Sequence, residues 1–153
     1  MVEIKVTITG LDDFANGIRM APQETVKQLS LAIQKSIDVI HRNAMVEAPV
    51  NKQTGGGTLR QNIKGRMITK LSGVVESLAP YSIFVHEGTR PHDIRPIKAR
   101  GLANKRTGEY FGKLVHHPGT RANPYFARAA EKAQGKINEY FSAGMKKIVD
   151  LFR

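Results

Sequence analysis

Two long stretches with apolar residues on a single helical face constrain this chain most. The clearer stretch follows Asn123 and Pro124, residue types that suit an N-cap and the first turn of a helix. Its apolar positions recur every three or four residues, as on one face of an α-helix. They are Phe126, Ala130, Ala133, Ile137, Phe141, Met145, Ile148 and Phe152. We therefore predict a helix over 124–152, roughly 40–45 Å long at ~1.5 Å per residue.

The second stretch begins near Pro22, which is tolerated in a first helical turn, and ends before Pro49. Its apolar stripe consists of Val26, Leu29, Ile33, Ile37, Ile40 and Ala44. A helix with one apolar face buries that face against another element, most simply a sheet.

Residues 2–8 alternate between apolar and polar side chains, which predicts a strand with one buried face that ends at Gly10. A short helix is predicted to follow over 12–20, because aspartates at its start are good N-caps.

Residues 59–78 predict two further strands with a break at 71–73, and therefore an antiparallel hairpin. The alternation in both strands is imperfect. The apolar positions are Ile63, Met67 and Ile68 in the first strand and Val74, Val75 and Leu78 in the second.

The length and composition fit one soluble domain spanning 1–153. The chain has 153 residues, 41% of them hydrophobic, and no cysteine. A domain of this size buries enough surface to fold without disulfides or metal. Its apolar runs are shorter than the ~20 residues a bilayer requires, and its N-terminus lacks the pattern of a signal peptide. We expect a cytoplasmic protein without a membrane partner.

The glycine run at 55–57 does not fit a phosphate-binding loop. It lacks the Gly-Lys-Ser/Thr ending of a P-loop, contains no spaced Gly-x-Gly-x-x-Gly motif, and follows a helix instead of a strand. We expect a flexible connection here and no nucleotide cofactor.

Five histidines raise the question of a metal site. His86-Glu87 begins like a zincin motif, but Arg90 stands where the second histidine belongs. His116 and His117 are adjacent, which on a strand directs them to opposite sides. We expect no metal, and histidines that hydrogen-bond the chain around two glycine turns.

Catalytic groups can be combined only on paper, as Ser82 with His86 or as Glu47 with Glu87. No nucleophile elbow is present, and no spacing brings these groups within reach of one another. We expect no catalytic residue, no small-molecule substrate and no enzyme.

The strongest compositional signal is positive charge, with 24 Lys and Arg against 13 Asp and Glu and a net charge of +11. Such a chain attracts polyanions or acidic protein surfaces. Segment 90–106 concentrates this charge, with six basic residues and one acid, Asp93. The basic residues are Arg90, Arg95, Lys98, Arg100, Lys105 and Arg106.

The prolines and glycine of this segment predict an extended loop or a loose strand pair. Three interpretations stay open: a solvated loop, a contact with a neighbouring subunit or acidic partner, and a contact with nucleic acid. No helix-turn-helix or zinc-finger pattern favours the last.

Three blocks of sequence stand out by their order and spacing. The first is Ala48-Pro49-Val50, then Thr54-Gly55 and Gly57-Thr58-Leu59-Arg60. The second is Tyr81-Ser82-Ile83-Phe84-Val85-His86-Glu87-Gly88-Thr89, then Pro91-His92 and Ile94-Arg95-Pro96. The third is Val115-His116-His117-Pro118-Gly119-Thr120, then Ala122-Asn123-Pro124-Tyr125-Phe126. Over roughly 10–135 the chain resembles the head–tail joining or tail-completion family of long-tailed bacteriophages, although its Gly55-Gly56-Gly57 run is wider than the family's turn.

The resemblance implies a twisted sheet with flanking helices, in a subunit that assembles as a homo-oligomeric ring between the portal or neck and the tail tube. It implies a virion component assembled in the bacterial host cytoplasm, with no cofactor and no chemistry. The motif residues would then determine the fold, with glycines at positive φ, prolines in turns, and Tyr81 and Phe84 in the core. They are Gly57, Thr58, Leu59, Tyr81, Glu87, Gly88, Thr89, His117, Pro118, Gly119, Pro124 and Phe126.

Together these observations predict an α+β fold. A mostly antiparallel twisted sheet packs against a long helix in the N-terminal half and a long C-terminal helix. The basic loop would reach a neighbouring subunit or an acidic partner ring, with unspecific DNA contact as an addition. The alternatives are a basic nucleic-acid-binding protein of phage or prophage origin, and a metal-dependent nuclease or toxin that uses His116 or His117.

Overall fold

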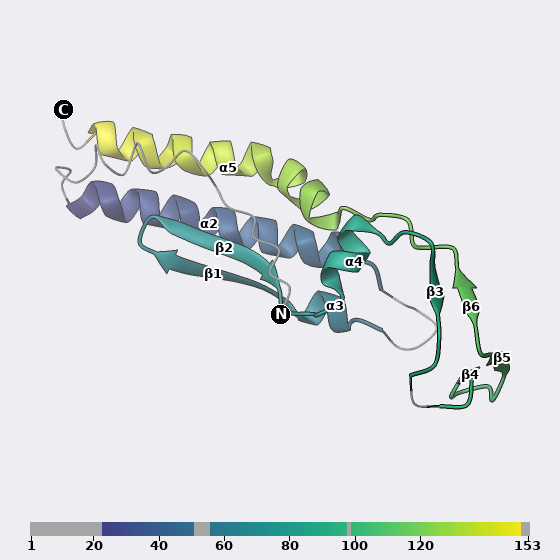
Figure 1. Ribbon diagram of the computed structural model, residues 1–153. Coiled ribbons are helices and arrows are strands. Elements are labelled where there is room, and N and C mark those ends of the chain that lie inside the picture. The colour runs from purple at the N-terminus through teal and green to yellow at the C-terminus, as the bar shows by residue number, and fades with distance from the viewer. Residues whose placement is uncertain (1–22, 51–55, 98, 151–153) are drawn as a thin grey trace. The chain divides into compact units, whose positions relative to one another are not determined.

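A computed structural model describes residues 23–50, 56–97 and 99–150 (Figure 1). Contacts divide the chain into two compact units, one formed by Met1–Ile83 with Pro124–Arg153 and the other by Phe84–Asn123. We call them the helical unit and the basic unit. The strand predicted over 2–8 and the short helix over 12–20 lie outside the described residues. The prediction that 1–153 forms a single domain stays a prediction.

Two long helices dominate the helical unit, as predicted. Helix α2 spans Gln23–Glu47 and helix α5 spans Tyr125–Asp150. They run antiparallel side by side (Figure 1). Glu47 at the end of α2 binds Arg128 at the start of α5, and at the other end of the pair Leu29 packs with Ile148. The start of α5 is stabilised by the Pro124 carbonyl, which accepts the Arg128 N–H at 3.2 Å.

The buried faces follow the predicted stripes, with one local deviation. On α2 the predicted positions from Leu29 to Ala44 are all buried. On α5 the small residues Ala129 and Gly144 are buried, which allows the two helices to approach each other closely. A Cβ at Gly144 would lie 3.5 Å from the Gln28 carbonyl oxygen. Met145, predicted to face the core, is exposed instead.

The predicted hairpin is present and packs on α2. Strand β1 spans Ile63–Thr69 and strand β2 spans Ser72–Ser77, paired antiparallel. A Cβ at Gly73 would lie 2.0 Å from Cδ1 of Ile37, so this glycine lets the hairpin approach the helix closely. Strand β2 is buried at four successive positions, Val74 to Ser77, which explains why the sequence showed imperfect alternation.

The stretch before the hairpin is helical, whereas the sequence predicted strand from residue 59. Helix α3 covers only Thr58–Gln61, and its Leu59 is buried. Gly57 has a φ of 147°, and its carbonyl accepts the Gln61 N–H at 2.9 Å. The prediction of positive φ at Gly57 is therefore confirmed.

The prediction that Tyr81 and Phe84 fill the core is wrong. They are 43% and 57% exposed, and the buried residue of the short helix α4, Ser82–Glu87, is Ser82. Tyr125 and Phe126 fill the core instead, with ring centroids 4.7 Å apart. Burial raises the pKa of the Tyr125 hydroxyl.

The basic unit contains four short strands in two antiparallel pairs. Strand β3, His92–Ile94, pairs with β6, Val115–His117. Strand β4, Leu102–Ala103, pairs with β5, Tyr110–Gly112. The predicted α+β class is confirmed, with small antiparallel sheets and two long helices. In the described ranges, no helix has the length and apolar character needed to cross a bilayer.

Candidate functional site

The second and third sequence blocks meet within the basic unit. The backbones of Thr89 and Thr120 exchange two hydrogen bonds, 2.9 Å and 3.1 Å long. The glycine before each threonine has positive φ, 77° at Gly88 and 87° at Gly119. A Cβ at Gly88 would lie 2.4 Å from the Thr120 carbonyl oxygen, and one at Gly119 would lie 2.3 Å from that of Thr89. The predicted role of both glycines is therefore confirmed.

Histidines line the adjoining strand pair. His92 and His117 are directly opposite each other on β3 and β6, and their rings stack with centroids 5.0 Å apart. At the next position, His116 Nδ1 lies 2.5 Å from an Asp93 carboxylate oxygen. His117 Nδ1 accepts the Gly119 N–H at 3.0 Å, so this histidine hydrogen-bonds a glycine turn as predicted.

These contacts leave the histidines poorly suited to a metal. The Nδ1 lone pair of His117 is used by Gly119. Three or more ligand groups are needed for a tight site, and the described residues contain no such group of His, Asp and Glu. On β3 and β6, His92, His116 and His117 each contact another group of the chain.

The β4–β5 hairpin presents two of the predicted cations on an ordered turn. The Asn104 side-chain oxygen accepts the backbone N–H of Arg106 at 2.9 Å and of Thr107 at 3.4 Å. The backbone N–H of Asn104 donates to Glu109 O, and the Asn104 carbonyl accepts the Gly108 N–H. This side-chain cap is a common way to fix a turn. Lys105 and Arg106 are exposed within it.

The predicted basic loop is therefore part of a larger basic surface. Arg90, Arg95, Arg100, Lys105 and Arg106 are all exposed, and none forms an ion pair with another described residue. Lys98 lies outside the described residues. The idea of a strand pair within 90–106 is wrong, because β3 and β4 each pair with a strand beyond residue 106.

Over the whole basic unit, eight Lys and Arg oppose three acids, for a net charge of +5. Sequence reasoning missed Lys113 and Arg121, which lie beyond the segment that it singled out and are also exposed. The sequence alone did not indicate that these two residues belong to the same unit as segment 90–106, because the strands that pair there are far apart in the chain.

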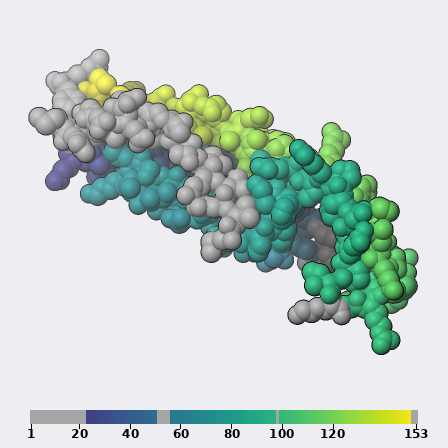
Figure 2. Space-filling model, viewed as in Figure 1, coloured from purple at the N-terminus to yellow at the C-terminus, as the bar shows by residue number. Residues whose placement is uncertain are grey.

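The basic unit also exposes apolar side chains and has no core of its own. None of its described residues is buried. Figure 2 shows part of this surface in teal and green. Ile97 is 96% exposed. The other exposed large apolar residues of the unit are Phe84, Tyr110, Phe111 and Leu114. Exposed apolar and basic side chains without a core beneath them are typical of a surface that binds another protein.

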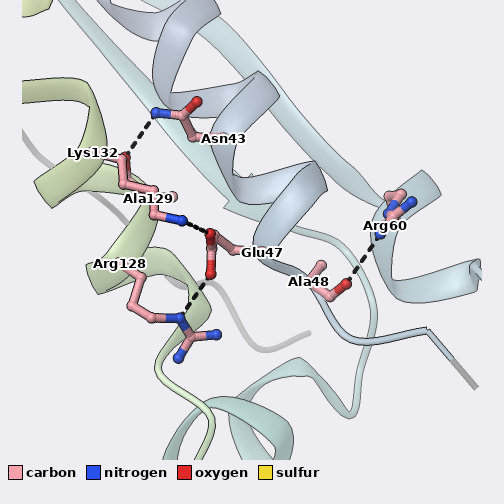
Figure 3. Close-up of polar contacts among 7 residues, drawn as sticks. All are labelled: Asn43, Glu47, Ala48, Arg60, Arg128, Ala129 and Lys132. Atoms are coloured by element: carbon pink, nitrogen blue, oxygen red, sulfur yellow. Dashed lines mark hydrogen bonds and ion pairs between the residues drawn. The ribbon is translucent and has the colours of Figure 1, made fainter.

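The helical unit contains a cluster of charged side chains that joins its two long helices. Glu47 binds Arg128 at 2.8 Å and also binds Lys132, which ties α2 to α5 (Figure 3). Asn43 donates to the Ala129 carbonyl at 3.2 Å, and Arg60 donates to the Ala48 carbonyl (Figure 3). The hydrogen bonds from Arg128 and Lys132 hold the pKa of the Glu47 carboxyl below that of an ordinary glutamate.

The candidate catalytic pairs weighed from the sequence gain no support from this geometry. Glu47 is bound by two cations of its own unit, and Glu87 belongs to the basic unit. Ser82 is fully buried.

Comparison of the chain with protein-family models, curated proteins and solved structures found no match in any of the three.

Proposed function

We propose that this chain is a structural, non-catalytic subunit that forms a ring at the head–tail junction of a tailed bacteriophage. In this proposal it acts in the neck or in tail completion, between the portal and the tail tube. It is assembled into the virion in the cytoplasm of the bacterial host and needs no cofactor.

One observation carries the proposal. The second and third blocks of the phage-like motif pair with each other through Thr89 and Thr120, although β3 to β6 separate them in the chain. Motif residues that contact one another support a shared fold more strongly than separate short matches do. The glycines at positive φ and the exposed, basic, apolar surface fit a subunit that completes its packing against partners.

The proposal is tested by deleting the gene from a phage or prophage that carries it. Full heads and tails that fail to join, seen by electron microscopy and restored by the wild-type gene in trans, are expected. Normal infectious virions without this chain would overturn the proposal.

A second candidate function is nucleic-acid binding, and the exposed Tyr110 and Phe111 beside unpaired cations favour it. Aromatic rings among basic side chains can stack on bases while the cations meet phosphates. Duplex binding that weakens steeply with salt is expected in that case, but only sequence preference would indicate a regulator. Weak unspecific DNA binding is compatible with both functions.

A further inference from the structure

We infer that a hollow in the basic unit, formed by β4 and the loop that connects β3 to it, binds a short acidic and apolar segment of a different protein. The inference deepens the proposed function and rests on it, since it names what a ring subunit would receive at this surface. The hollow has a volume of about 520 Å³ and is open to solvent. Its lining is Arg95, Pro96, Ile97, Ala99, Gly101, Leu102 and Ala103.

One wall of the hollow is held in shape by the β4–β5 hairpin. A Cβ at Gly101 would lie 2.3 Å from the Tyr110 ring, so the ring packs directly on the backbone there. Leu102 then pairs with Gly112 in the hairpin. Because the Asn104 turn closes this hairpin with side-chain and backbone hydrogen bonds, the wall is ordered before a ligand arrives.

The lining combines one cation with an apolar surface. Arg95 is exposed and has no ion-pair partner among the described residues. Ile97 and Leu102 supply aliphatic surface in the same hollow. A guanidinium can bind a carboxylate with two parallel hydrogen bonds, and a neighbouring aliphatic wall favours an apolar side chain. The fitting ligand is therefore a peptide in which a carboxylate lies next to a leucine-like residue.

Charge balance makes the described part of a second copy a poor source of that ligand. The two long helices of the helical unit are neutral or positive: α2 has three acids and three Lys or Arg, and α5 has three acids and five. Five of the ten described acids already bind a basic side chain of their own chain. These are Glu24, Glu47, Glu76, Asp93 and Glu139. Charge complementarity thus favours an acidic partner of another kind over the neighbouring subunit.

Nucleic acid fits the hollow less well. Its lining contains no aromatic side chain on which a base could stack. Ile97 is also nearly fully exposed, so a bound nucleic acid would place its phosphates against an aliphatic side chain, a contact that adds no affinity. Protein is therefore the favoured partner class, and duplex DNA serves as a competing probe.

The test measures fluorescence anisotropy of labelled probes against the full chain. The probes are an alternating glutamate–leucine peptide, a poly-glutamate peptide of equal charge, and a short DNA duplex. The glutamate–leucine peptide is expected to bind tightest. Arg95→Gln should weaken its binding about 10-fold or more, as for the loss of a charged hydrogen bond. Arg106→Gln removes the same charge outside the hollow and should weaken it less than about 3-fold.

A matched apolar pair completes the design. Ile97→Ser should weaken the glutamate–leucine peptide about 5-fold or more, following the loss of apolar contact, and leave poly-glutamate and duplex binding unchanged. Ile68→Ser, on β1 of the helical unit, should leave all three unchanged. Both side chains are exposed, so neither change disturbs a packed core.

Equal losses for Arg95→Gln and Arg106→Gln, or a poly-glutamate peptide or duplex that binds as tightly as the glutamate–leucine peptide, would overturn the inference. Self-association independent of any probe but abolished by Ile97→Ser would assign the hollow to a second copy and overturn it as well. Light scattering on the same variants separates the two proposals. Rings without peptide binding overturn only this inference, whereas peptide binding without rings, even when phage head or tail components are added, overturns the proposed function.

Discussion

Thr89 and Thr120 donate their backbone N–H groups to each other's carbonyl oxygens, at 2.9 Å and 3.1 Å. Each follows a glycine whose missing Cβ leaves room for the opposite backbone. This reciprocal pair joins the two ends of the basic unit and brings the second and third sequence blocks into contact.

Replacing Gly119 with alanine should open this joint. The residue would face both the ~1–2 kcal/mol cost of a left-handed conformation and a backbone overlap with Thr89. Hydrogen exchange should show lost protection of the Thr89 and Thr120 amides. Gly108→Ala is the control, because Gly108 has a φ of 74° but open space around it. Unchanged protection in Gly119→Ala would contradict this account of the pair.

Replacing Gly73 with alanine should destabilise the helical unit by ~1–3 kcal/mol, because the new Cβ meets Ile37 in a packed core. The cost should fall when Ile37 is valine, which lacks the Cδ1 atom in the way. Urea denaturation of the double-mutant cycle measures this coupling. Gly135→Ala, where a Cβ meets nothing within 4 Å, should be neutral or stabilising. Additive effects of Gly73→Ala and Ile37→Val would refute the close approach.

The Glu47 cluster should make stability depend on pH on the acid side. Since Arg128 and Lys132 lower the pKa of Glu47 in the folded chain, its contribution is present above the unfolded pKa. That contribution disappears as the pH falls through the lower folded pKa. Glu47→Gln should therefore lower Tm at pH 7, and the difference from wild type should shrink in acid.

The control for this experiment is Glu131→Gln on α5, the helix that carries Arg128 and Lys132, where the carboxylate is exposed and makes no ion pair with another described residue. It should change Tm little at any pH. A Tm difference for Glu47→Gln that is the same at pH 7 and in acid would contradict the ion-pair account.

Reversing Arg95, Lys98 and Arg100 to glutamate should abolish virion assembly, since it replaces a positive surface with a negative one. The matched control reverses three exposed lysines of the helical unit, Lys64, Lys70 and Lys146. Plaque formation by complementation and electron microscopy provide the measurement. Intact assembly with the first triple variant would remove the basic surface from the proposed function.

The helices were predictable because their signals are local. The stripe from Leu29 to Ala44 and the prolines near the helix ends define α2 and α5 within a few residues. The ends of these two helices followed from residue chemistry, whereas positive φ at Gly57, Gly88 and Gly119 was expected from the family resemblance. These features depend on neighbours in the chain, so a single sequence carries them.

Long-range contacts were not predictable in the same way. Nothing local indicates that His92 pairs with His117, or that Asp93 binds His116. Tyr81 and Phe84 were assigned to the core by the family resemblance, but both are exposed, and α4 buries only Ser82. Ile97 gave no signal of its own in the sequence, because Ile94 and Leu102 lie in the same basic segment, and its place in a hollow depends on the β4–β5 hairpin.

The central claim is that the chain forms a ring, and the mass of the purified protein in solution tests it most directly. Light scattering after size exclusion, across concentration and salt, should give a discrete ring-sized species, or a monomer that forms one when phage head or tail components are added. A monomer that does not bind those components but binds a defined DNA sequence tightly would contradict the claim and favour the nucleic-acid-binding function.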